Sequence, residues 1–63
     1  MIEVENRGKK KRVRGVKDVA SLFEKLKLNP GEYVVSVNGK IVLEDEKLKE
    51  GDKVKLYPVV SGG

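Results

Sequence analysis

The chain has 63 residues, of which 38% are charged, and a formal net charge of +4. It contains no cysteine and no histidine, which excludes disulfides, thiolate metal sites, cysteine nucleophiles and histidine acid–base catalysis. A core of this size leaves little room for an internal active-site cavity. We therefore expect one small domain over residues 1–60 that is not an enzyme. No apolar run approaches the roughly 18 residues of a membrane span, so we expect a cytoplasmic protein with no membrane partner.

The first two predicted strands form a hairpin. Residues 1–5 alternate apolar and polar, which is the period of a half-buried strand. Residues 6–8 carry a turn signal. A second strand follows around residues 11–14, with Val13 as its inward residue.

A helix follows, because the apolar period changes from two to about 3.6. Its apolar side chains fall at i, i+3, i+4 and i+7, at Val19, Leu22, Phe23 and Leu26. Asp18 directly precedes them and suits the N-cap position. Asn29-Pro30-Gly31 is expected to end a helix of about ten residues, which is too short to be stable without packing on a sheet.

Three more strands are predicted in the second half of the chain. Residues 33–37 are rich in β-branched side chains, and the Asn38-Gly39 pair that follows favours a type I′ hairpin turn. Residues 41–43 make the returning strand. A charged connection leads to the last strand over residues 53–60. The order predicts an α+β fold, with a mixed sheet of four to five strands and one main helix packed on one face.

Three motifs in the second half of the chain carry a family resemblance. They are the run 35–42 around the Asn-Gly turn, the run 48–56 around Glu50-Gly51-Asp52, and the end of the chain, 58–63. Together they resemble the ubiquitin-like sulfur carriers, a family that includes the thiamine-biosynthesis carrier (ThiS), the small subunit of molybdopterin synthase (MoaD) and the archaeal small modifier proteins. The resemblance implies a β-grasp (ubiquitin-like) fold.

The same resemblance implies a function for the C-terminal Gly62-Gly63. A ubiquitin-activating-type adenylyltransferase would use ATP to adenylate Gly63. A sulfurtransferase would convert the product to a thiocarboxylate, and a sulfur-accepting synthase would use it in thiamine, molybdopterin or tRNA-thiolation biosynthesis. No cofactor would be bound permanently, since ATP belongs to the partner enzyme. Two glycines without Cβ atoms suit a narrow channel, and we expect residues 61–63 to be a flexible tail.

Two other functions stay open from the sequence. Within the family, Gly63 could instead be conjugated to lysines of target proteins, which would make the chain a ubiquitin-like modifier. Outside the family, the basic hairpin at residues 9–14 could serve a small RNA-binding module. Such binding would fall steeply with salt and would not need the two terminal glycines.

A docking surface for the activating enzyme is predicted beside the C-terminal end. If the last strand turns Val54 and Leu56 inward, period two places Tyr57 and Val59 on the opposite face. Exposed apolar residues next to a functional tail indicate a partner contact. Proline cannot donate to a sheet ladder, so strand pairing should weaken at that point. The predicted docking set is Val34, Ser36, Tyr57, Pro58, Val59, Val60 and Ser61.

Two charged runs are candidate sites. The basic run is a candidate anion contact and consists of Lys9, Lys10, Lys11, Arg12 and Arg14. No aromatic residue lies within it to stack on bases, so we favour a solvated hairpin tip and expect no nucleic-acid partner. The acidic run 44–46 lacks calcium-loop spacing. It is interpreted as a solvated loop, and no metal site is predicted.

Overall fold

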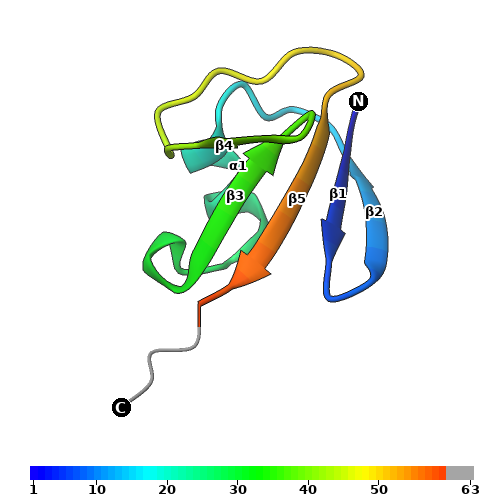
Figure 1. Cartoon of the computed structure of the whole chain (residues 1–63). Coiled ribbons are helices and arrows are strands. Elements are labelled where there is room, and N and C mark those ends of the chain that lie inside the picture. The colour runs from blue at the N-terminus through cyan, green and yellow to red at the C-terminus, as the bar shows by residue number, and fades with distance from the viewer. Residues whose placement is uncertain (60–63) are drawn as a thin grey trace.

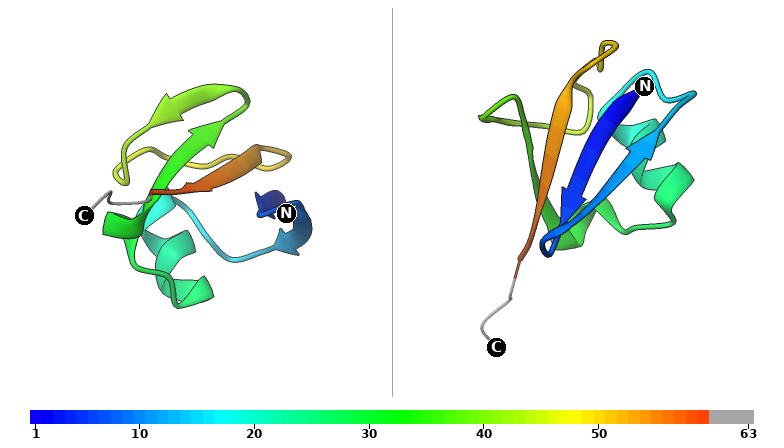
Figure 2. Two further views of the ribbon diagram at one scale, coloured as in Figure 1. Left: turned by 60° about the horizontal axis from the view of Figure 1, so that its bottom comes forward. Right: turned by 90° about the vertical axis from the view of Figure 1, so that its right-hand side faces the viewer.

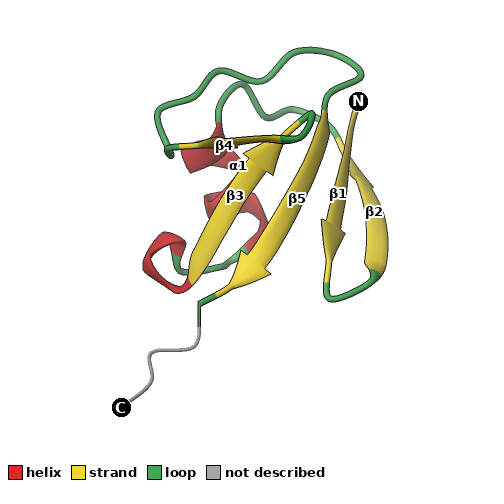
Figure 3. Cartoon of the chain, viewed as in Figure 1, coloured by secondary structure: helices red, strands yellow, loops and turns green. Residues whose placement is uncertain are grey.

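The structure is a five-stranded mixed sheet with a helix against one face (Figure 1). The computed structural model describes residues 1–59. Figure 3 distinguishes the elements, which in chain order are β1 (Ile2–Asn6), β2 (Lys9–Val13), α1 (Val19–Leu26), a 3-10 helix (Pro30–Glu32), β3 (Tyr33–Val37), β4 (Lys40–Val42) and β5 (Lys53–Pro58). The strands lie in the order β2-β1-β5-β3-β4. The predicted fold class, α+β with the β-grasp arrangement, is confirmed.

The centre of the sheet is the parallel pair β1–β5. Glu3 lies beside Lys53 and Asn6 beside Leu56 in this pair, while the other strand pairs are antiparallel. A parallel pair needs a long crossover between its strands. Here the crossover contains α1 and the β3–β4 hairpin. This parallel pair makes the sheet mixed, as the sequence predicted.

Both hairpins are closed by two-residue turns with positive φ. Asn38 and Gly39 have φ of 52° and 87°, and Arg7 and Gly8 have φ of 53° and 79°. Positive φ at both central residues is the geometry of a type I′ turn, whose twist matches that of paired strands. The Asn-Gly pair therefore closes the predicted hairpin.

The start of α1 is fixed by a capping box. The Ser21 N–H donates to Asp18 Oδ1 at 2.8 Å, and Ser21 Oγ lies 3.2 Å from the Asp18 N–H. These bonds satisfy backbone donors that the first helical turn leaves free. Asp18 is thus the N-cap that the sequence predicted.

The end of α1 differs from the prediction. The helix has eight residues and ends at Leu26, because Lys27 takes a left-handed conformation with φ of 58°. The N–H of Leu28 then bonds the carbonyl of Phe23 at 2.9 Å, which satisfies a carbonyl at the helix C-terminus. Pro30 comes later, where it begins the 3-10 helix instead of stopping α1.

The segment between β4 and β5 is tied to the start of α1. The N–H groups of Val19 and Ala20 bond the carbonyls of Glu46 and Glu44 at 3.0 and 2.9 Å. Leu48 is buried and anchors this segment in the core. The acidic run 44–46 is exposed, and its backbone serves as an acceptor for the helix N-terminus.

The core lies between α1 and one face of the sheet. Alternate residues of the strands and one stripe of the helix are buried there, and they include Ile2, Val4, Val13, Val19, Leu22, Phe23, Val35, Val37, Val54 and Leu56. The view from the side in Figure 2 shows α1 on one side of the sheet only. The opposite face, called the outer face below, is left without a covering layer in the described part of the chain.

Candidate functional site

Apolar side chains gather on the outer face at the β3–β5 pair. Val34 lies opposite Tyr57 in the register, and Ile41 lies opposite the next outward residue of β3. Val34 is 38% exposed, Tyr57 45% and Ile41 67%. Val34 and Tyr57 are direct cross-strand neighbours, about 5 Å apart, and Ile41 lies diagonally from Val34 at about 7–8 Å. We call these three side chains the apolar patch below. Val34 and Tyr57 are outward as predicted.

Ser36 corrects one part of the predicted docking set. It lies on the outer face as period two requires, but its side chain is only 5% exposed. The reason is its position between Lys55 on β5 and Ile41 on β4, which are its register neighbours. A small side chain between two long ones is covered by them. Ser36 therefore forms the floor of the outer face and is not an exposed contact residue.

The strand that leads to the C-terminus is shorter than predicted. β5 ends at Pro58 instead of Val60. Pro58 has no N–H to donate, and it is the last residue in register with β3. The N–H of Val59 makes one more bond, at 2.8 Å, to the carbonyl of Glu32. Pro58 and Val59 are both exposed, so this end of the strand is accessible to a partner.

Four predicted site residues lie outside the described residues. They are Val60, Ser61, Gly62 and Gly63. The predictions made for them, both docking and sulfur carriage, stay predictions.

The basic run of the first hairpin is divided between two faces. Strand alternation puts Lys10 and Arg12 on the outer face, while Lys9 and Lys11 share the face of the buried Val13. Arg14 lies beyond the end of β2. All five basic residues are exposed. The structure therefore does not bring them together as one anion-binding cluster.

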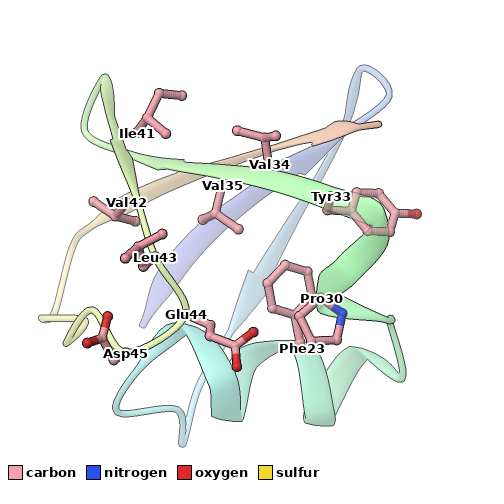
Figure 4. A pocket seen from close by; sticks show the side chains of 10 residues that line it. All are labelled: Phe23, Pro30, Tyr33, Val34, Val35, Ile41, Val42, Leu43, Glu44 and Asp45. Atoms are coloured by element: carbon pink, nitrogen blue, oxygen red, sulfur yellow. The ribbon is translucent and has the colours of Figure 1, made fainter. Parts of the chain in front are cut away.

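A second apolar surface was missed by the sequence reasoning. A hollow of about 520 Å³ lies between β3, β4 and α1. Its lining includes Phe23 and Val35 on the core side and Leu43 and Glu44 at the edge, and it adjoins the apolar patch through Val34 and Ile41 (Figure 4). Leu43 is 76% exposed and lies outside β4, which ends at Val42. The run of three apolar residues 41–43 was a usable signal, because strand alternation cannot turn all of them toward one core.

The titratable groups with shifted pKa values have structural roles. Hydrogen bonds from the N–H of Lys49, at 2.8 Å, and from the Asn38 amide, at 3.0 Å, lower the pKa of Asp52. Asn38 Oδ1 in turn accepts from the N–H of Lys53 at 3.0 Å. This network joins the β3–β4 turn to the start of β5. The pKa of Asp18 is lowered chiefly by the backbone N–H of Ser21 and then by its hydroxyl.

Residues 1–59 contain neither a metal-binding group of side chains nor a membrane-spanning helix. No group of three or more histidine, cysteine, aspartate or glutamate side chains in this part of the chain is arranged to hold a metal ion. Neither α1 nor any other described helix has the length and apolar character needed to cross a membrane.

Known proteins resemble this chain over its whole length. The model of the ThiS family matches residues 1–63. The crystal structure of the thiamine biosynthesis protein ThiS from Geobacter metallireducens aligns with a TM-score of 0.67 and 25% identity, over 97% of this chain and 99% of that one. A solution structure of a thiamine biosynthesis protein from the same organism aligns with a TM-score of 0.61 and 29% identity, over 97% and 87%. SAMP1 from Haloferax volcanii aligns with a TM-score of 0.69, over 98% of each chain, and at 20% identity this likeness concerns the fold alone.

Proposed function

The chain belongs to the ThiS family, and from this premise we propose that it is a sulfur carrier whose C-terminal Gly63 bears the sulfur as a thiocarboxylate. Members of the family are small carrier proteins of ubiquitin-like fold and not enzymes. The protein is accordingly a substrate that other enzymes activate and unload.

The observation that carries the proposal is the position of the apolar patch beside the C-terminal end of β5. Tyr57 directly precedes Pro58, the last residue of β5, and Val34 is the cross-strand partner of Tyr57. Five residues follow Pro58 in the sequence, and a chain of that length reaches at most about 17 Å. A partner that binds the patch is therefore within reach of Gly63.

The chemistry supplied by the chain is that of a carboxylate. The α-carboxyl group has an ordinary pKa of about 3.5, so at neutral pH it is ionised and nucleophilic. One of its oxygens attacks the α-phosphate of ATP, and pyrophosphate leaves. Hydrosulfide delivered by the sulfurtransferase then attacks the carbonyl carbon, AMP leaves, and loss of the S–H proton gives the thiocarboxylate. The activating enzyme provides the catalytic groups, while the chain provides a terminus without side chains that enters a narrow site.

The test is the intact mass of the protein isolated from its native host in the absence of added nucleophiles. Replacement of one oxygen by sulfur, localised to Gly63, is the expected result. Removal of Gly62 and Gly63 gives the matched control, which should carry no such change. Larger adducts joined to lysine through Gly63 would assign the chain to the protein modifiers. A terminus that stays an unmodified carboxylate with ATP and the host's activating enzyme supplied would refute both functions.

A further inference from the structure

The outer face carries a regular array of charges beside the apolar patch. Strand alternation and the register place six charged side chains there in three rows, Lys10 and Arg12 on β2, Glu3 and Glu5 on β1, and Lys53 and Lys55 on β5. We call these six residues the charged band. Each glutamate lies between two basic residues in register with it. Four basic residues against two acidic ones leave the band with an excess of positive charge.

The charged band and the apolar patch form one surface. Lys55 lies beside Ser36 and two residues before Tyr57, so it borders both areas. A hollow of about 610 Å³ on this face is lined by residues of both, among them Glu5, Lys10 and Ile41. A partner that covers the patch broadly would therefore also meet the band.

The two areas lie at different distances from the C-terminal end. With a rise of about 3.3 Å per residue, Lys55 lies about 10 Å and Lys53 about 17 Å back along β5 from Pro58. The side chain of Tyr57, by contrast, is next to Pro58 in the chain. The patch is thus the nearer contact and the band the farther one.

We propose that the charged band is a second docking area for the activating enzyme, and that it binds carboxylate side chains on the surface of that enzyme. These carboxylates lie about 7–13 Å farther from the adenylation site than the apolar surface that receives Tyr57, at the rise of about 3.3 Å per residue along β5. This inference rests on the proposed function, because it assumes that the activating enzyme is the partner of the outer face. It adds the chemistry and the position of a second contact.

The array fits a protein partner better than a nucleic acid. A nucleic-acid backbone brings phosphates at regular short spacing, and the row formed by Glu3 and Glu5 would repel those that pass over it. A folded protein can instead place separate carboxylates opposite the lysines and leave the glutamates to solvent or to polar groups. The adjoining apolar patch also favours a protein. Within the band there is no aromatic side chain on which a base could stack.

The charged band is expected to speed and orient the association with the activating enzyme more than to tighten the complex. The basic residues of the band are exposed, so each charge pair is screened by salt and is individually weak. Complementary charges raise the association rate and disfavour wrong orientations. The band should therefore affect KM and its salt dependence and leave kcat unchanged.

The experiment uses ATP–pyrophosphate exchange catalysed by the host's activating enzyme, with the full chain as substrate. The variant K53E/K55E reverses two charges of the band. The variant K40E/K47E makes the same charge change on exposed residues of β4 and the following connection, outside the band. At low salt K53E/K55E should raise KM by about tenfold with kcat unchanged, and added salt should reduce the difference. K40E/K47E should keep the wild-type KM.

Folding must be checked, because K53E/K55E places four carboxylates close together. The neutral variant K53Q/K55Q avoids that repulsion and should raise KM by about threefold. If wild type is adenylated and K53Q/K55Q and a folded K53E/K55E both keep its KM, the inference is overturned and the proposed function stands. If wild type is not adenylated, the proposed function fails, and the inference fails with it. If the KM values are unchanged while a labelled host tRNA binds wild type but not K53E/K55E, the band belongs to a nucleic acid and the inference is likewise overturned.

Discussion

The apolar patch makes a quantitative prediction for Tyr57→Ala. Tyrosine buries about 150–250 Å² in a well-packed interface, so the 45% of Tyr57 that is exposed corresponds to about 90 Å². At about 25 cal/mol per Å², burying this area contributes about 2 kcal/mol, and its loss should raise Kd for the activating enzyme about thirtyfold. Stability should fall less, because the exposed cross-strand pair with Val34 contributes about 0.2–1 kcal/mol.

The assay is titration calorimetry with the host's activating enzyme, together with urea unfolding of each variant. Leu43→Ala is the matched control, since Leu43 is more exposed than Tyr57 and lines the hollow shown in Figure 4, but does not line the outer-face hollow to which Tyr57 belongs. Its Kd should equal that of wild type. A wild-type Kd for Tyr57→Ala, with the variant fully folded, would refute the docking role of the patch. An equal rise in Kd for both variants would show that loss of any exposed apolar side chain weakens binding, whichever face of the sheet carries it.

Three further predictions concern the cap, the core and the end of the chain. The pKa of Asp18 is lowered from its ordinary 3.8 chiefly by the hydrogen bond from the backbone N–H of Ser21. The stabilisation from this carboxylate is therefore complete above pH 3.8 and is lost as the pH falls through the lower pKa of the folded state. Asp18→Asn should remove this part of the pH dependence of the unfolding free energy, measured by urea unfolding below about pH 4. Leu22→Ala should lower the free energy of unfolding by about 2–5 kcal/mol, out of a total of about 3–9 kcal/mol for the domain. Circular dichroism should then show that much of the protein is unfolded. A loss below about 1 kcal/mol would contradict the assignment of Leu22 to the core. Deleting Ser61 shortens the maximum distance between Pro58 and Gly63 by about 3.5 Å. The Kd for the enzyme should stay unchanged, while the adenylation rate should fall about 100-fold. An unchanged adenylation rate would contradict the argument from chain length.

The order and pairing of the elements could be predicted from the sequence because local signals agree with the tertiary arrangement. The period of two in β1 and β5 assigns Val4 and Val54 to the core, and the capping residue Asp18 marks the start of the helix. The Asn38-Gly39 turn fixes the register of β3 and β4, since a two-residue turn allows little choice. Each of these signals acts within a few residues.

The features that were missed depend on neighbours distant in sequence or on weak local preferences. The burial of Ser36 follows from Ile41 and Lys55 beside it. The Asn38-Gly39 turn already identifies Ile41, but Lys55 cannot be identified before the register of β3 and β5 is known. The end of α1 depends on Lys27 taking positive φ, which is uncommon for lysine. The basic run was treated as one cluster, although the period of two already separates Lys10 and Arg12 from their neighbours.

The candidate site lies on the outer face because the other face of the sheet is occupied by the core and α1. α1 covers that face, and its residues are constrained by packing. The outer face has no such constraint, so its side chains are free to serve a partner. A contact at the apolar patch alone would leave the domain free to rotate about that point. A second contact at Lys53 and Lys55, farther from Pro58, would fix the direction of β5, and with it the direction in which the chain leaves the domain toward the adenylation site. Complementary charges disfavour wrong orientations when the domain docks, so the second contact would lower KM, which gives a physical reason for two areas of different chemistry on one small face.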